Sequence, residues 1–295
     1  MLRALGLRAA YARARRRLGG VPWRTRRFLG TVLPEPVKKP IKAVLRLLRP
    51  PADGPATAEP AADESPKAAP PGPEREQRRA EELAYWRERG RSEDVLANSW
   101  FESLFTRHFG LEPSFYAGKA VLDVGCGPRG SLEWAGMASR RVGLDPLAHR
   151  YVGLGLEGQD MSYVSAAAEA MPFCDGSFDV VSAFNSLDHV DDLGQTVREL
   201  VRVLRPGGLL LLIVDVNHEP TVCEPQVLSW DVLSSFGPRM RPVEVRHLER
   251  HTNNIYANVE RPVPFDHEKG SDRRGVMVAM LEKVDDTGAE REGDR

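Results

Sequence analysis

The stretch Val121-Leu122-Asp123-Val124-Gly125-Cys126-Gly127-Pro128-Arg129-Gly130 decides the fold. Its apolar start is typical of a buried parallel strand, and the glycine-rich turn that follows lets backbone approach a ligand closely. Asp123, two residues before the first glycine, would repel the phosphates of a dinucleotide. This position therefore favours a ligand that is cationic at that end.

Charge is distributed very unevenly along the 295 residues, although the net charge is −1. Residues 1–50 carry fourteen Lys/Arg and one acid, a net charge of +13, whereas the remaining residues carry −14. A basic head of this kind favours an anionic partner. The three cysteines show no paired spacing, so we expect a reducing compartment, no disulfide framework and no metal site. No apolar run is long enough to span a membrane.

Residues 1–49 are predicted to form a basic, partly amphipathic helical arm. Ile41, Val44, Leu45 and Leu48 follow the spacing of one helix face. Such a helix could lie on an anionic membrane surface, pack on the rest of the chain or remain a solvated arm. We expect a cytoplasmic protein that can associate with a membrane through this arm. A mitochondrial presequence is the alternative, although residues 1–49 contain no serine. No aromatic platform favours nucleic-acid binding.

The rest of the chain divides by composition. Residues 50–75 are a Pro/Ala-rich linker that buries too little apolar surface to become ordered, residues 76–284 form the main domain, and the acidic tail at 285–295 is predicted to be disordered. Helices are expected at Glu74–Arg89 and Glu93–Phe109, the second with aromatic residues that either pack in the core or cover a ligand.

From Ala120 onward, apolar strands alternate with helical stretches. This alternation predicts an α/β fold with a parallel sheet and helices on both faces. Strands are expected at 120–124, 141–144, 161–164, 179–184, 209–216, 243–248 and 276–284, and helices at 131–139, 146–156 and 193–204, the last capped by Asp191 or Asp192.

Asp145 ends the second strand, 20 residues after Gly125, where an acid can hold both hydroxyls of a ribose. Enzymes that use NAD share this arrangement and the GxGxxG spacing of Gly125–Gly130, so a nicotinamide oxidoreductase is the rival interpretation. The charge of Asp123 counts against it, and no tyrosine is followed by a lysine four residues later, as a short-chain dehydrogenase requires. The ammonium and sulfonium groups of S-adenosylmethionine (SAM) fit Asp123 better.

Three downstream segments resemble the class I SAM-dependent methyltransferases. They are Ala168–Val181, which contains Met-Pro-Phe and Phe-Asp-Val-Val, the loop Asn185–Asp192, and Val203–Leu209 with Arg-Pro-Gly-Gly. The resemblance covers roughly residues 90–285. It implies a Rossmann-like seven-stranded sheet, mostly parallel with an antiparallel last strand, and SAM across the carboxyl ends of the first four strands.

The resemblance also implies roles for single residues. Gly125 and Gly127 let the backbone approach the methionine part of SAM, Asp123 attracts its ammonium group and Asp145 accepts from the ribose hydroxyls. Ala167 stands where the family usually has an acid that contacts the adenine, so a SAM-fold binding protein without catalysis stays an alternative. The residues expected to bind the cofactor are Asp123, Gly125, Cys126, Gly127, Asp145, Pro146, Ala168, Glu169 and Asn185.

Methyl transfer to an oxygen needs positioning and a base. His189, in the loop after the fourth strand, is the best candidate; the alternative is that it only closes the pocket. His218, directly after the fifth strand, is expected to face the same cleft. The polar segments 217–225 and 251–274 favour a small-molecule acceptor, and a loose likeness to glycan-type bacterial methyltransferases favours an oxygen of a sugar-like or lipid-linked metabolite.

Overall fold

The computed structural model describes residues 72–92, 98–151, 154 and 159–285. The predicted arm at 1–49, nearly all of the linker at 50–75 and nearly all of the tail at 285–295 lie outside these residues. Membrane contact through the arm therefore stays a prediction. Among the described helices, none combines the length and the apolar composition that crossing a membrane requires.

Seven strands form one sheet in the order β3-β2-β1-β4-β5-β7-β6. Every neighbouring pair is parallel except the two pairs that β7 makes with β5 and β6. This confirms the predicted seven-stranded, mostly parallel sheet with an antiparallel last strand. The strands are β1 (Ala120–Val124), β2 (Arg140–Leu144), β3 (Ser162–Val164), β4 (Phe178–Phe184), β5 (Leu204–Val216), β6 (Met240–Glu249) and β7 (Gly275–Lys283).

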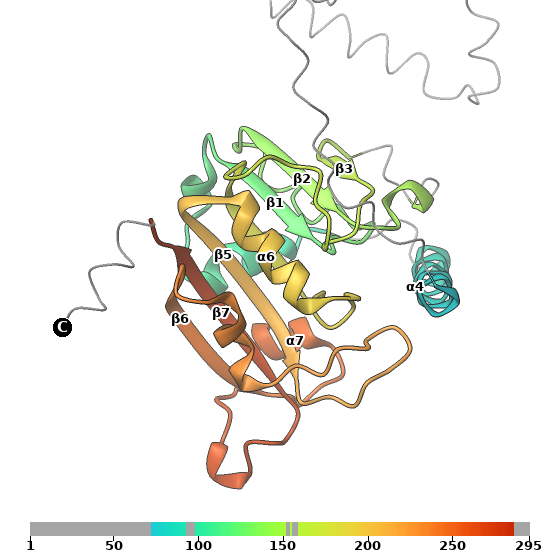
Figure 1. Ribbon diagram of the computed structural model, residues 1–295, viewed down its shortest axis with the longest axis vertical. Helices are drawn as coiled ribbons and strands as arrows, with labels where there is room; N and C mark the ends of the chain where they lie inside the picture. The colour runs from blue at the N-terminus through green and yellow to red at the C-terminus, as the bar shows by residue number, and fades with distance from the viewer. Residues whose placement is uncertain (1–71, 93–97, 152–153, 155–158, 286–295) are drawn as a thin grey trace, which may run out of the picture. The chain divides into compact units, whose positions relative to one another are not determined.

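Both faces of the sheet are covered, which explains why its central strands are apolar along their length. One face packs against α6 (Leu193–Val203), which lies in front of the sheet in Figure 1, and against η6 (Trp230–Phe236). The other face packs against α5 (Phe101–Phe105) and α7 (Ile255–Glu260). The remaining helical segments are α4 (Pro73–Ser92), η2 (Arg107–Phe109), η3 (Pro113–Tyr116), η4 (Ala148–Arg150) and η7 (His267–Lys269).

The prediction of a helix at 131–139 is wrong, because these residues form successive turns. The guanidinium of Arg141 donates to the carbonyl groups of Leu132 and Glu133, at 3.4 and 3.1 Å, which a helix would have used internally. A helix of so few residues is marginal without such groups.

Two further predicted helices are shorter than expected. The helix predicted at 93–109 is helical in its described part only at α5 and η2, because Thr106 leaves the helical conformation, with φ −113° and ψ −86°, and separates the two. The helix predicted at 146–156 is reduced, in its described part, to η4. In contrast, α4 extends the predicted helix 74–89 at both ends.

Strand β5 begins at Leu204, directly where α6 ends, and not at 209 as predicted. The segment Arg205–Gly208 is an irregularity within the strand, since the pairing with β4 shifts between Phe178 and Val180. Gly207 adopts a φ of 69° there, which glycine tolerates without strain. The glycine pair therefore lies within β5, and α6 passes into this strand without an intervening loop.

The N-cap of α6 is Asp192, whose carboxylate accepts the N–H of Gln195 at 2.8 Å. Asp191, the other predicted cap, instead pairs with Arg75 and Arg78 of α4.

Replacing Asp192 by alanine leaves the Gln195 N–H without this partner. We expect Asp192→Ala to lower the free energy of unfolding by about 1 kcal/mol, measured by urea denaturation followed by circular dichroism. Asp160→Ala is the matched control, because Asp160 is an exposed acid outside any helix. An equal loss of stability in both variants would contradict the cap.

Candidate functional site

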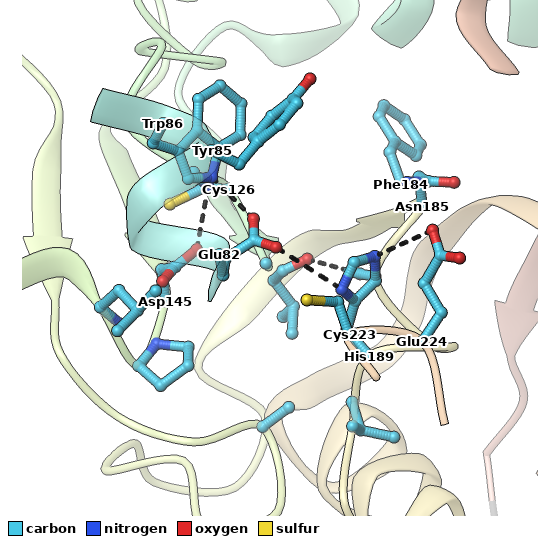
Figure 2. A pocket seen from close by; sticks show the side chains of 18 of the residues that line it. Glu82, Tyr85, Trp86, Cys126, Asp145, Phe184, Asn185, His189, Cys223 and Glu224 are labelled. Carbon is cyan, nitrogen blue, oxygen red and sulfur yellow. Dashed lines mark hydrogen bonds and ion pairs between the residues drawn. The ribbon is translucent and has the colours of Figure 1, made fainter. Parts of the chain in front are cut away.

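A cavity of about 930 Å³ lies at the carboxyl ends of β1, β2 and β4. Here the strand order changes direction, which is where ligands bind in open α/β sheets. Figure 2 shows the side chains that converge on it. The turn after β1, the loops after β2, β4 and β5, and residues of α4 and α7 line it.

The turn after β1 requires glycine at two positions. Gly125 has a φ of 73°, and a Cβ there would lie 2.4 Å from the Cβ of Ser186. Gly127 has a φ of 57°, and a Cβ would lie 2.9 Å from the Trp86 ring. Ser186 and Trp86 therefore leave no room for a side chain at either glycine, and the backbone of the turn forms this part of the cavity wall.

Asp123 lies at the cavity wall but is 4% exposed. Its carboxylate accepts the hydroxyl of Ser182 at 2.6 Å and the hydroxyl of Ser131. Burial raises the pKa of Asp123 to about 6, against the lowering effect of the two hydroxyls. The carboxylate is thus held in place and only partly satisfied.

Asp145 binds the turn from the neighbouring strand. Its two carboxylate oxygens accept the backbone N–H of Gly127 at 3.0 Å and of Leu147 at 2.8 Å. Burial raises its pKa to about 6, partly offset by these bonds. A carboxylate has about four acceptor positions, so two remain for a ligand.

The other residues that the sequence assigned to cofactor binding also line the cavity, and Ala167 lies beside them. Glu169, one of the predicted cofactor-binding residues, accepts the backbone N–H of Asp191 at 2.6 Å and of Asp192 at 3.2 Å. It therefore fixes the start of α6 as well. The remaining members of this group are Cys126, Pro146, Ala168 and Asn185.

His189 lies in the cavity wall between carboxylates from three segments, as Figure 2 shows for Glu82 and Glu224. Its Nδ1 is 4.0 Å from Glu82 of α4. Its Nε2 is 3.9 Å from Asp188 and 4.0 Å from Glu224, which follows β5. The imidazole is 29% exposed and can reach a ligand.

His218 does not line the cavity, contrary to the prediction that it faces the cleft. Its side chain is 1% exposed, and its Nε2 lies 3.6 Å from Asp188. The side chain turns behind the loop after β4 because its Nδ1 bonds to the carbonyl of Glu219 at 2.8 Å.

Helix α4 also lies at the cavity, which its sequence did not predict. Leu83 packs against Leu147 and Tyr151, and Trp86 packs against the same cluster. Glu82 and Trp86 also line the cavity. The Trp86 N–H donates to Glu82 at 2.7 Å. Only the common side of Leu83 and Trp86 hinted at a buried face.

Aromatic rings form a second wall of the cavity. Trp100 stacks on Phe101 with ring centroids 4.0 Å apart, and Tyr256 of α7 lies 5.0 Å from Trp100. Asn253 and Asn254 lie next to them at the cavity. The aromatic segment around 100–105 therefore contributes both to the cavity wall and to the core, in which Phe105 is buried.

Comparison with known proteins places this site in a family. Residues 122–212 match the family model described as "Methyltransferase domain". The chain is 29% identical to the O-methyltransferase resE of Aspergillus sclerotiorum over 219 residues, which cover 68% of this chain and 81% of resE. The chain is a class I SAM-dependent methyltransferase.

Other relatives of this methyltransferase share less of its length. It is 38% identical to the methyltransferase GfsG of Streptomyces halstedii over 105 residues, 32% of this chain and 37% of GfsG. A solved structure of geranyl diphosphate methyltransferase in complex with SAM covers 63% of the chain and 85% of that protein, at 20% identity and a TM-score of 0.44.

The cofactor of the methyltransferase is SAM, and the residues present fit it. The backbone of the glycine turn is open to the cofactor, and a Cβ at Gly125 or Gly127 would have no room. Asp123 is a buried carboxylate suited to an ammonium group. Asp145 keeps acceptor capacity for hydroxyl groups. The nicotinamide alternative is set aside, whereas the role of each single residue stays a prediction.

The methyltransferase offers a matched pair of glycines to test the turn. We expect Gly125→Ala to weaken SAM binding at least about tenfold, roughly 1.4 kcal/mol, by isothermal titration calorimetry. Gly118 has the same φ of 73° with nothing near its Cβ position. Gly118→Ala therefore introduces the same backbone strain as Gly125→Ala but no steric clash with a neighbouring residue. Equal SAM affinities in the two variants would contradict the assigned turn.

The pKa values of about 6 for Asp123 and Asp145 predict how SAM binding depends on pH. Both carboxylates are charged above pH 6 and protonate below it, while the ammonium of SAM stays charged. We therefore expect at least about tenfold weaker SAM binding at pH 5 than at pH 7.5, measured by calorimetry. Asp123→Asn should flatten this dependence, and an unchanged slope would contradict the role of Asp123.

Proposed function

We propose that this methyltransferase transfers the methyl group of SAM to a hydroxyl oxygen of a sugar-like or lipid-linked small molecule. The hydroxyl oxygen attacks the methyl carbon and the carbon–sulfur bond breaks. The electron pair of that bond returns to sulfur, which gives neutral S-adenosylhomocysteine. The hydroxyl proton leaves to a group of the protein or to solvent.

The observation that carries this proposal is the position of His189 among carboxylates in the cavity wall. A hydroxyl has a high pKa, so its transfer reaction needs a proton acceptor, whereas the sulfonium is already activated. The carboxylates 3.9–4.0 Å from His189 would stabilise the imidazolium that forms when it takes the proton. Methylation of a thiolate or an activated carbon would depend less on a proton acceptor beside the methyl group.

The wall of the cavity supports an acceptor with an apolar body and polar substituents. The Trp100, Phe101 and Tyr256 rings offer an apolar face, and Asn253 and Asn254 offer amide donors and acceptors. The similarity to resE, an O-methyltransferase, supports an oxygen acceptor. A lipid-linked acceptor would also suit the predicted basic arm at 1–49.

Labelled SAM tests the proposal directly. We expect the purified chain to move the labelled methyl group into hydroxylated compounds of a metabolite extract, as base-stable ethers. His189→Ala should lower kcat about 10²- to 10⁴-fold with little change in SAM affinity. His149→Ala is the control, because His149 is exposed and outside the cavity lining.

Failure to methylate any fraction while SAM binds normally would favour the SAM-fold binding protein without catalysis. Label that enters amines or thiols alone would contradict the oxygen acceptor. Equal kcat values for the wild type and His189→Ala would remove His189 from the proton transfer.

A further inference from the structure

Asp188, His189 and Glu224 bring three potential metal-ligand atoms within 4.8 Å of one another. The Nε2 atom of His189 lies 3.9 Å from Asp188 Oδ1 and 4.0 Å from Glu224 Oε1. These separations are too long for hydrogen bonds. Adjacent ligand atoms on one cation, each about 2.0–2.2 Å from it, lie roughly 3.0–3.5 Å apart, so the three side chains would have to move inward slightly to bind an ion.

The loops that supply these ligands are fixed to one another. The N–H of Gln226 donates to the carbonyl of Asp188 at 3.1 Å, and its side-chain amide donates to the carbonyl of Val190 at 3.1 Å. The loop after β4 and the loop after β5 are thus joined on either side of His189. A site built across the two loops would be held in shape before an ion enters.

A second, independent observation points to a positive charge at Asp188. His218 and Asp188 are 3% and 1% exposed, and His218 Nε2 lies 3.6 Å from Asp188 Oδ2. Neither atom has a hydrogen-bond partner among the described residues. The Nδ1 atom of His218 must carry the proton that bonds the Glu219 carbonyl, because a carbonyl only accepts. Nε2 of a neutral His218 is therefore an acceptor facing another acceptor.

Two buried polar atoms that face each other without a hydrogen bond are unfavourable, and a cation bound to the Asp188 carboxylate would offset this. The carboxylate of Glu82 adds further negative charge, 4.0 Å from His189 Nδ1. A divalent ion on the Nε2 side of His189 would offset the two carboxylates that face it. It would bind Asp188 through Oδ1, the oxygen that faces His189, while Oδ2 stays beside His218.

We propose that Asp188, His189 and Glu224 form a divalent-cation site at the acceptor end of the cavity, with His218 as a positioning residue for Asp188. Two carboxylates and one imidazole favour Mn²⁺ or Zn²⁺ over Mg²⁺ or Ca²⁺. The proposed site contradicts the expectation that the chain has no metal site.

The catalytic use of this ion rests on the proposed function. An acceptor hydroxyl bound to the ion becomes more acidic. With the ion bound, His189 is a ligand and the proton would pass to Glu82 or to solvent. The role of His189 as proton acceptor, proposed above, then applies only to the chain without the ion. The methyl transfer itself is unchanged in its balance of bonds and electrons.

Binding of Mn²⁺ alone to the full chain tests the site. Electron paramagnetic resonance of free Mn²⁺ should show one equivalent bound with a dissociation constant below about 100 μM. We expect Glu224→Gln and Asp188→Asn each to weaken binding at least about tenfold, and His218→Gln to weaken it about 10- to 100-fold. Glu219→Gln is the matched control, because Glu219 is exposed on the same loop and contacts His218 only through its backbone.

SAM affinity and circular dichroism of each variant show whether it is folded, and neither depends on the ion. Lack of saturable binding of both Mn²⁺ and Zn²⁺ up to about 1 mM would overturn the proposal, as would equal affinity in the wild type and Glu224→Gln. Mn²⁺ binding without any methyl transfer would contradict the proposed function alone. Transfer that is unaffected by EDTA, in a chain that binds Mn²⁺, would overturn the catalytic use and keep the site.

Discussion

The carboxylate of Asp145 accepts the backbone N–H groups of Gly127 and Leu147, and it thereby ties the glycine turn after β1 to the loop after β2. The turn can close this tightly only because Gly125 and Gly127 adopt positive φ angles without a Cβ. Gly143 of β2 completes the arrangement, since a Cβ there would lie 2.5 Å from the Cys126 sulfur. The cavity floor therefore depends on three glycines and one buried acid.

Much of the fold could be predicted because β1, β4 and β5 are buried on both faces and thus have apolar sequences. The turn could be predicted as well, since a glycine-rich turn directly after a buried parallel strand is typical of a ligand-binding site in α/β folds. The connection 131–139 could not, because its carbonyl groups bond to Arg141 of the next strand. The local sequence pattern of this connection does not predict a hydrogen bond to a residue of the next strand.

The same distinction holds within the site. His189 and His218 looked alike in sequence, since each follows a strand that ends at the cavity. Their different places follow from one bond: the Glu219 carbonyl holds the ring of His218 behind Asp188. Helix α4 shows the same limit, because its position depends on the pairing of Arg75 and Arg78 with Asp191, over 100 residues away in sequence.

The arrangement of acids in the cavity also fits the charge change of methyl transfer. The sulfonium loses its positive charge in the reaction, so carboxylates close to sulfur would stabilise the ground state more than the transition state. The described cavity places Asp123 and Asp145 at the ends of β1 and β2, and it gathers Glu82, Asp188 and Glu224 around His189. Acids in the first group suit the ammonium and ribose of SAM. Acids in the second group suit the deprotonation of the acceptor. They stabilise the positive charge of a proton or a metal ion beside the oxygen that must lose its proton.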